Sequence, residues 1–248
     1  MPNINDSYFD GSYKEMWRTI IPEELTVKEV DFMLSYFKLQ PESKVLDLMC
    51  GYGRHAIALS KKGIAVTAID NLSDYINEIR QVVEAENLPV NAIQADVTKF
   101  TTNDKFDVAI IMGNSLNFFD ADDTVKLLAN VSSHLKPGGH LLINSWTIAE
   151  IAIKNFKEKG WTNIGEMKFL VDNKFLFQPS RIEAESTMIA PDGNVEVKNG
   201  VDYIFSLNEI EAMLQKTGFT LTEVYSIPGK KKFIIGEPRA YIVAEKAR

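Results

Sequence analysis

The sequence has 248 residues, of which 45% are hydrophobic and 25% are charged. These are ordinary values for a globular domain with a substantial core, and they exclude a mainly disordered chain. The formal net charge of -7 disfavours sequence-independent binding to nucleic acid, because such binding depends on neutralising phosphates with Lys and Arg.

Cys50 is the only cysteine, so no disulfide can form within the chain and a reducing compartment is expected. We interpret its thiol as a small buried apolar group rather than a nucleophile. The sequence contains no apolar run long enough to span a membrane and no signal-peptide pattern, which predicts a cytoplasmic protein. Three histidines without paired Cys/His spacing predict no metal site.

The first predicted element is an aromatic-rich helical segment. Five large side chains can share one face of a short helix: Tyr8, Phe9, Tyr13, Met16 and Trp17. Two interpretations stay open. The segment either packs on the core as a terminal extension, or forms a lid whose rings cover a pocket. Together with the next helix it makes up an expected N-terminal helical lid segment, residues 1–40.

That next helix has a predicted start and end. Thr26 is the expected N-cap, and Glu29 three residues later would complete a capping box. An apolar stripe from Val27 to Phe37 continues the helix, which Pro41 ends.

The stretch from Val45 to Ala56 predicts a ligand site. A β-prone apolar run is followed by Gly51 and Gly53, and then by a helical apolar pattern from Ala56 onward. A strand, a glycine turn and a helix in this order point backbone N–H groups at a bound anionic group. The same spacing would also fit a nicotinamide dinucleotide.

Strands and helices then alternate along the chain. The predicted order is a strand at 44–49, a helix at 54–62, a strand at 64–69, a helix at 73–86, strands at 90–94 and 106–112, a helix at 122–135, a turn at 136–139 and a strand at 140–145. Such alternation implies a parallel sheet with right-handed crossovers, covered by helices on both faces. Residues 41–160 are therefore assigned to an α/β core.

The pattern changes beyond this core. Short β-type runs separated by turns predict an antiparallel insertion at residues 161–205. Residues 206–248 are expected to complete the core sheet, with a helix that Ser206 caps and two further strands. Lys230, Lys231 and Lys232 are interpreted as a solvated loop.

Several predicted strands end in residues suited to a nucleoside. Asp70 follows the second strand, 19 residues beyond Gly51, where a carboxylate can accept hydrogen bonds from ribose hydroxyls. Asp96, after the third strand, could bind an adenine amino group, with Leu72 and Val97 packing on the ring faces. Ligands of doubly wound sheets bind at these carboxyl ends of the strands.

Together these features resemble the class I methyltransferases that use S-adenosylmethionine. Asp47, Gly51 and Gly53 match the family's acid-x-G-x-G-x-G motif, whereas Met49 stands at its first glycine. A bacterial small-molecule subset, many of whose members have no assigned function, is more similar still, through the segment from Cys50 to Ala56 and the aromatic opening. The resemblance implies a doubly wound, mostly parallel, Rossmann-like seven-stranded sheet with an antiparallel C-terminal strand and a small antiparallel β insertion.

The resemblance also implies a set of site residues. Those expected to bind S-adenosylmethionine are Tyr13, Asp47, Met49, Gly51, Gly53, Asp70, Asn71, Leu72, Asp96, Val97, Met112 and Asn114. Those expected on the substrate side are Tyr8, Trp17, Ser115, Arg181 and Arg239, the two arginines for a carboxylate or phosphate. Both arginines could equally be surface charges.

Methyl transfer by direct displacement depends mainly on positioning, so no catalytic base is required. His55, directly after the glycine loop, is the one candidate base, and we favour a structural role for it as a helix N-terminal residue.

The sequence therefore predicts a cytoplasmic S-adenosylmethionine-dependent methyltransferase that acts on a small molecule and releases S-adenosylhomocysteine. Two alternatives remain, a nicotinamide-dependent oxidoreductase and a non-catalytic module that binds S-adenosylmethionine or S-adenosylhomocysteine. No nucleic acid or membrane partner is expected, although RNA or protein methylation stays possible. The sequence leaves the oligomeric state open.

Overall fold

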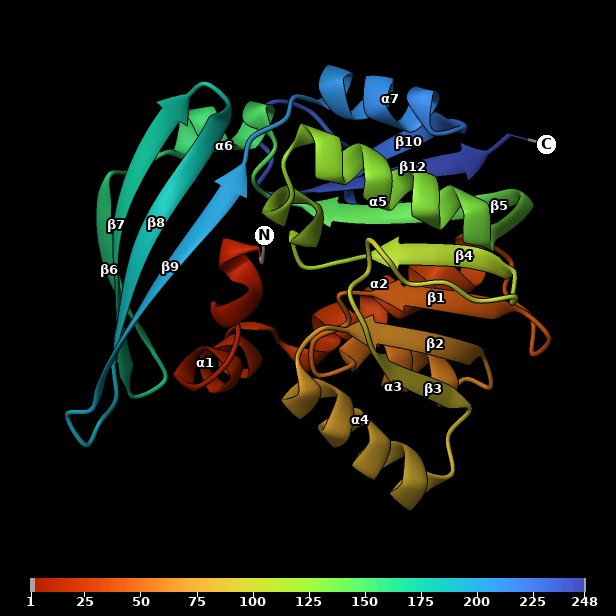
Figure 1. Ribbon diagram of the computed structural model, residues 1–248, viewed down its shortest axis with the longest axis horizontal. Coiled ribbons are helices and arrows are strands. Elements are labelled where there is room, and N and C mark those ends of the chain that lie inside the picture. The colour runs from red at the N-terminus through yellow and green to blue at the C-terminus, as the bar shows by residue number, and fades with distance from the viewer. Residues whose placement is uncertain (1–2, 248) are drawn as a thin grey trace.

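Two separate sheets organise the computed structural model, which describes residues 3–247 (Figure 1). The first two residues of the expected lid segment and the last residue of the chain lie outside this range.

The main sheet has eight strands rather than the expected seven. In spatial order they are β11 (Lys231–Lys232), β10 (Phe219–Ile227), β12 (Ala240–Lys246), β5 (Leu135–Ser145), β4 (Phe106–Ile111), β1 (Lys44–Leu48), β2 (Ala65–Asp70) and β3 (Val90–Gln94). The five strands from β5 to β3 are parallel, whereas β12, β10 and β11 pair antiparallel. The Rossmann-like fold predicted from the sequence is confirmed.

The extra strand corrects the interpretation of the three consecutive lysines. Lys231 and Lys232 form β11 at the edge of the sheet, although no apolar pattern marks them as a strand. The ammonium group of Lys232 lies 4.7 Å from the centroid of the Tyr225 ring and pairs with Glu223 on the neighbouring strand. These two contacts order a segment that its local sequence suggests is a solvated loop.

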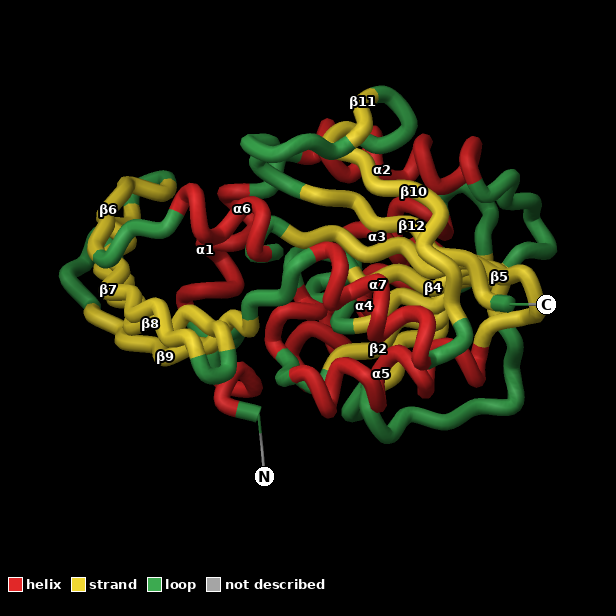
Figure 2. Tube along the Cα trace, turned by 90° about the horizontal axis from the view of Figure 1, so that it is seen from above, coloured by secondary structure: helices red, strands yellow, loops and turns green. Residues whose placement is uncertain are grey.

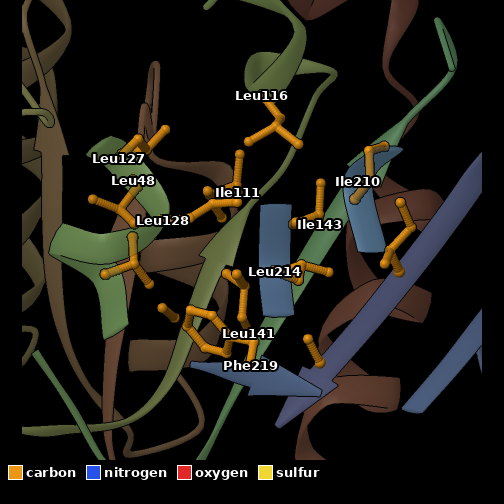
Figure 3. Close-up of a cluster of buried hydrophobic side chains, with 14 of the residues drawn as sticks. Leu48, Ile111, Leu116, Leu127, Leu128, Leu141, Ile143, Ile210, Leu214 and Phe219 are labelled. Carbon is orange, nitrogen blue, oxygen red and sulfur yellow. The ribbon is translucent and has the colours of Figure 1, made fainter. Parts of the chain in front are cut away.

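Helices cover both faces of the main sheet. Its helices are α2 (Glu23–Tyr36), α3 (Arg54–Ser60), α4 (Ser73–Glu86), α5 (Ala121–His134) and α7 (Leu207–Lys216). The α2 and α3 helices bury their apolar residues against one face, and α5 and α7 bury theirs against the other, where Leu128, Ile143 and Leu214 meet (Figure 3). Because both faces are covered, the central strands are apolar almost without interruption.

The start of α2 differs from the prediction. The helix begins at Glu23, with Pro22 at its N-cap, so Thr26 lies one turn inside. Proline fixes its own φ and lacks an N–H, and the acidic residues at 23 and 24 favour the positive end of the helix dipole. The predicted capping box of Thr26 and Glu29 is therefore wrong. A smaller difference is that β5 begins at Leu135 rather than at His140.

The second sheet contains four antiparallel strands in the order β6-β7-β8-β9. They are β6 (Lys159–Ile164), β7 (Met167–Phe177), β8 (Ser180–Ile189) and β9 (Val195–Tyr203), and the short helix α6 (Ala149–Asn155) precedes them. In both views the N-terminal elements η1 (Ile4–Ser7) and α1 (Ser12–Ile20) lie between the two sheets (Figures 1 and 2). The buried side chain of Asn5 ties η1 to β9 by one hydrogen bond to the carbonyl of Val201 and one from its N–H, each 2.9 Å long.

Candidate functional site

A cavity of about 950 Å³ lies at the carboxyl ends of the parallel strands, walled by the N-terminal segment and the second sheet. Most of the predicted site residues line it, namely Tyr8, Tyr13, Trp17, Asp47, Met49, Gly51, His55, Asp70, Asn71, Leu72, Asp96, Val97, Met112, Asn114 and Ser115. Gly53, Arg181 and Arg239 are absent from its lining.

The glycine loop adopts left-handed backbone conformations at three alternate residues. The φ angles are 53° at Met49, 55° at Gly51 and 76° at Gly53. A bulky residue such as methionine is rarely found at positive φ, because its Cβ crowds the backbone. The loop therefore keeps the conformation that glycine would favour at position 49, and strain of this kind is common at ligand sites.

Gly53 lies outside the cavity lining and allows close helix packing. A Cβ added there would lie 2.7 Å from a side-chain carbon of Ile79 on α4, so only glycine lets the two helices approach. At Gly51, by contrast, an added Cβ would meet nothing within 4 Å, and this residue lines the cavity.

Asp70 holds the glycine loop to the end of β2. Its carboxylate accepts the N–H of Gly51 at 2.8 Å and the N–H of Leu72 at 3.0 Å. Burial raises the pKa of this carboxyl, and the backbone hydrogen bonds oppose that rise. Each carboxylate oxygen can accept a second donor, so Asp70 can fix the loop and bind a hydroxyl at once.

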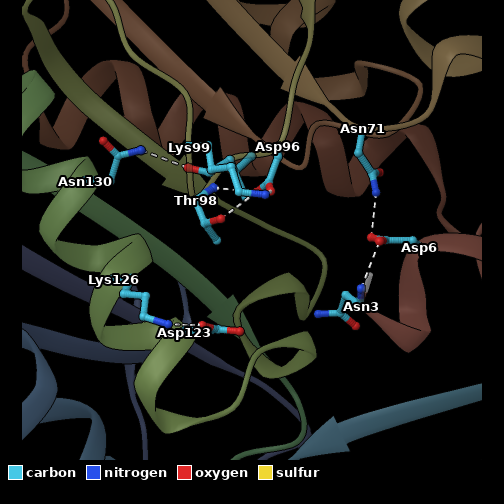
Figure 4. Close-up of polar contacts among 10 residues, drawn as sticks. Asn3, Asp6, Asn71, Asp96, Thr98, Lys99, Asp123, Lys126 and Asn130 are labelled. Carbon is cyan, nitrogen blue, oxygen red and sulfur yellow. Dashed lines mark hydrogen bonds and ion pairs between the residues drawn. The ribbon is translucent and has the colours of Figure 1, made fainter. Parts of the chain in front are cut away.

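Polar contacts hold the loop that follows β3, at residues 95–99 (Figure 4). The Asp96 carboxylate accepts the backbone N–H of Thr98 at 2.9 Å and pairs with Lys99 at 2.7 Å. Asn71, directly after β2, donates to Asp6 of η1 at 2.7 Å, which joins the glycine-loop side of the cavity to the N-terminal segment.

Asp47, at the end of β1, is buried and incompletely paired. It is 1% exposed, and its Oδ2 is the only buried side-chain oxygen or nitrogen of residues 3–247 without a hydrogen-bond partner. Burial raises the pKa of Asp47 to about 7, against the nearby positive charge of Arg54. A buried acceptor without a donor is costly, and a donor supplied by a ligand would remove that cost.

His55 belongs to a buried network centred on Glu29. The Glu29 carboxylate accepts hydrogen bonds from Arg54 at 2.6 Å, from His55 at 2.9 Å and from the hydroxyl of Tyr241 at 2.7 Å, while Arg54 also donates to Thr26. Burial alone would raise the pKa of Glu29, but the hydrogen bond from His55 and the neighbouring positive charge lower it to about 2.

Burial lowers the pKa of His55, so the neutral ring donates through Nε2 to Glu29. The hydrogen bond to Glu29 holds the His55 ring in place, which agrees with the structural role favoured from the sequence. The ring also lines the cavity. The central role of Glu29 was missed. Its spacing from Thr26, Val30 and Met33 on one helix face is the signal that could have revealed a buried acid.

Aromatic rings form the wall that the N-terminal segment contributes. The Tyr13 ring packs against Tyr8 at 4.8 Å between centroids and stacks on Trp17 at 6.1 Å, while Trp17 contacts Trp146 at 5.6 Å. Phe9 lies 4.7 Å from Phe118. These rings thus meet rings from the core loops around the cavity. Tyr8 and Phe9 precede α1, which begins at Ser12, so the prediction that they share one helix face with Tyr13 and Trp17 is wrong.

Asn114 connects the core loop to the second sheet. Its side-chain oxygen accepts the backbone N–H groups of Trp146 and Thr147, so its amide N–H₂ must point the other way, where it donates to Asp202 at 3.2 Å. Asp202, on β9, lines the cavity, and burial raises its pKa to about 7. Nothing in the local sequence singles out Asp202, because only the fold brings β9 to the cavity.

Acidic groups outnumber basic groups in the cavity lining. Six aspartates line it, Asp6, Asp47, Asp70, Asp96, Asp123 and Asp202, against three cations, Arg54, Lys99 and Lys126. Each of these cations is paired with an acid, Arg54 with Glu29, Lys99 with Asp96 and Lys126 with Asp123. The lining therefore favours a positively charged ligand.

The two arginines expected on the substrate side lie outside the cavity lining. Arg181 bonds to Glu183 and to the carbonyls of Gln178 and Pro179, and so fixes the turn between β7 and β8. Neither Arg181 nor Arg239 lines the cavity, and a role for either in binding a carboxylate or phosphate there has no structural support.

Residues 45–139 match a family described as a methyltransferase domain. Among curated proteins, the chain is 26% identical over 157 residues to the carboxy-S-adenosyl-L-methionine synthase of Vibrio atlanticus, and the match covers 59% of this chain and 64% of that protein. The chain thus spans less than two thirds of that relative's length.

Two solved structures share the fold. An S-adenosylmethionine-dependent methyltransferase from Clostridium acetobutylicum superposes with a TM-score of 0.82 at 19% identity, covering 95% of this chain and 96% of that one. CalS10 from Micromonospora echinaspora is an amino pentose methyltransferase solved with S-adenosylmethionine bound. It superposes with a TM-score of 0.72 at 17% identity, covering 96% of this chain and 98% of that one. Between residues 3 and 247, no helix is long and apolar enough to cross a membrane.

Proposed function

We propose that this chain, whose residues 45–139 match a methyltransferase domain family, is a class I methyltransferase that transfers a methyl group from S-adenosylmethionine to a small-molecule acceptor and releases S-adenosylhomocysteine. The observation that carries the proposal is the glycine loop held by Asp70 beside a buried, unpartnered carboxylate oxygen of Asp47, at the carboxyl ends of parallel strands. A nicotinamide-dependent oxidoreductase and a non-catalytic binding module are not favoured by the relatives described above.

The residues present fit this cofactor. Asp47 lacks a donor that the cofactor's ammonium group would supply, and Asp70 has acceptor capacity left for ribose hydroxyls. Asp96 and Tyr13 also line the cavity, and in this proposal Asp96 would bind the adenine while Tyr13 would offer an aromatic face to a cation. When bound, the cofactor supplies a methyl group on a positively charged sulfur.

The chain's own part in the reaction is to position the acceptor and exclude water. The aromatic wall and the second sheet enclose a volume that suits one cofactor and one small acceptor. Holding two reactants in line can supply roughly 7–11 kcal/mol of the barrier. The proposal includes an acceptor other than nucleic acid, which the acidic lining and the excess of acids in the chain support. It also includes a cytoplasmic setting, which the single cysteine supports.

Isothermal titration tests the proposal directly. We expect binding of S-adenosylmethionine and S-adenosylhomocysteine and no binding of NADH. Replacing Asp70 by Ala should weaken both interactions at least tenfold, because hydrogen bonds to charged groups contribute about 1.5–3 kcal/mol each. Asp74→Ala, on the exposed first turn of α4, is the matched control and should bind normally. Binding of NADH in place of the two sulfur compounds would refute the proposed function.

The lid interpretation makes a separate prediction. Deleting residues 1–20 should weaken S-adenosylmethionine binding about tenfold or more, since the aromatic faces that attract its positively charged sulfur, and their shielding from water, are lost. The melting temperature should fall by only about 4–8 °C, because the main apolar clusters include no residue before Val30. Glu15→Ala, exposed on α1, is the control. Unchanged affinity with a large loss of melting temperature would favour the terminal-extension interpretation.

A further inference from the structure

Asp202 is an acid held at the cavity wall by one fixed partner. Because the oxygen of Asn114 is committed to two backbone N–H groups, the amide cannot flip without losing both. Its N–H₂ group is therefore fixed toward one oxygen of Asp202. In the described part of the chain no other side chain or backbone group donates to Asp202, so the carboxylate keeps acceptor capacity for a ligand.

Among residues 3–247, no lysine or arginine forms an ion pair with this acid. Lys198 shares the inner face of β9 four residues away, but it is bound by Asp10 and Glu196. The titratable groups that face Asp202 from the N-terminal segment are Tyr8 and Tyr13. Burial and, to a lesser extent, the charge of Asp202 raise the pKa of each hydroxyl, so both stay neutral.

A carboxylate beside aromatic faces is suited to an ammonium group. The rings of Tyr8 and Tyr13, 4.8 Å apart between centroids, line the same cavity as Asp202. Aromatic faces attract cations and the carboxylate accepts their N–H groups. A carboxylic acid or phosphate acceptor would instead meet a like charge with no free cation to offset it.

We propose that Asp202 binds a small primary or secondary amine as the methyl acceptor and removes its proton before transfer. This inference rests on the function proposed above and adds the substrate class. The amine arrives as R–NH₃⁺ and passes one proton to the Asp202 carboxylate. Its freed lone pair forms the N–CH₃ bond, the S–CH₃ bond breaks, and the electron pair stays on sulfur. The product is R–NH₂⁺–CH₃, and Asp202 later releases its proton to water.

The ionisation of Asp202 agrees with this role. A general base works best when its pKa lies near the operating pH, and burial raises the pKa of this carboxyl to about 7. Activity toward an amine should therefore rise as the pH increases through 7, because the carboxylate form is the active one.

The test uses matched acceptors and the 248-residue protein. Benzylamine, benzyl alcohol and benzoic acid form one set, and glucosamine, glucose and gluconate form another. Methyl transfer is followed by mass spectrometry with isotope-labelled S-adenosylmethionine. We expect nitrogen methylation of an amine and no product from its alcohol or acid. Asp202→Asn should lower kcat/KM for the amine at least about 100-fold and remove the rise through pH 7, while S-adenosylhomocysteine affinity stays within about twofold.

Two further variants make the test decisive. Asp202→Glu keeps the charge and should retain amine binding with a reduced rate, and it serves if the Asn variant fails to fold. Glu185→Gln makes the same charge change at an exposed position of β8, outside the cavity, and should behave as wild type. Preference for an alcohol or acid, methylation of none of the amines, or full activity of Asp202→Asn would overturn this inference in a protein that binds S-adenosylhomocysteine. Loss of cofactor binding by the wild type would instead refute the proposed function.

Discussion

Replacing Glu29 by Ala should lower the free energy of unfolding by about 3–5 kcal/mol, as measured by urea denaturation at neutral pH. The carboxylate is 2% exposed and accepts hydrogen bonds from Arg54, His55 and Tyr241. Removing it would leave a buried guanidinium without its counter-ion and two further donors without an acceptor. Truncating one member of a buried charged network costs far more than the net contribution of the intact network.

The free energy of unfolding should fall when acid protonates Glu29. The folded pKa of Glu29 is about 2, below its ordinary value of 4.5, so the ionised carboxylate stabilises the fold. That contribution is complete above about pH 4.5 and is lost as the pH falls toward 2. Glu29→Gln should flatten the stability curve in this window. Asp31→Ala, exposed in the middle of the same helix, is the control and should change stability by less than about 0.5 kcal/mol. A loss below about 1 kcal/mol in Glu29→Ala would show that the network contributes little.

The elements predicted well from the sequence are those that local pattern determines. The strand at 90–94 and the helix at 73–86 coincide with β3 and α4, because an apolar run and a helical stripe carry their own signal. The glycine loop and the acids at the following strand ends lie together in the structure for a topological reason, since parallel strands deliver their carboxyl ends to one edge.

The residues that were missed depend on contacts between distant segments. Glu29 is stabilised by Tyr241, which lies 212 positions further along the chain, and Asp202 meets Asn114 across 88 positions. The sequence predicts Gly53 as a ligand residue, whereas the structure shows Ile79 of α4 packed against it. Arg181 suggests an anion site in the sequence, but in the structure its guanidinium donates to Glu183 and to the carbonyls of Gln178 and Pro179. Sequence spacing cannot supply these partners.

Asp47→Asn should separate stability from binding. The carboxyl has an ordinary pKa of 3.8 and a folded pKa of about 7, so the unfolded chain loses this proton first as the pH rises. Folding stability therefore falls between about pH 4 and pH 7, and the penalty remains in full above that range. The neutral amide removes this penalty. At pH 8 the free energy of unfolding of the unliganded protein should rise by about 2 kcal/mol, less than the ionisation shift alone implies because the amide must itself find partners.

The same substitution should weaken S-adenosylhomocysteine binding by about 10- to 100-fold, because a charge-assisted hydrogen bond to the ligand's ammonium group is lost. Wild-type affinity should strengthen as the pH rises through 7, and the variant should lose that dependence. Asp104→Asn, exposed and paired with Lys44, is the control for the change in net charge. A variant that is more stable but binds poorly would identify the unpartnered oxygen of Asp47 as a feature that binding requires at the expense of stability. A variant that is less stable and binds normally would show instead that Asp47 is structural, and would remove the main support for the cofactor assignment.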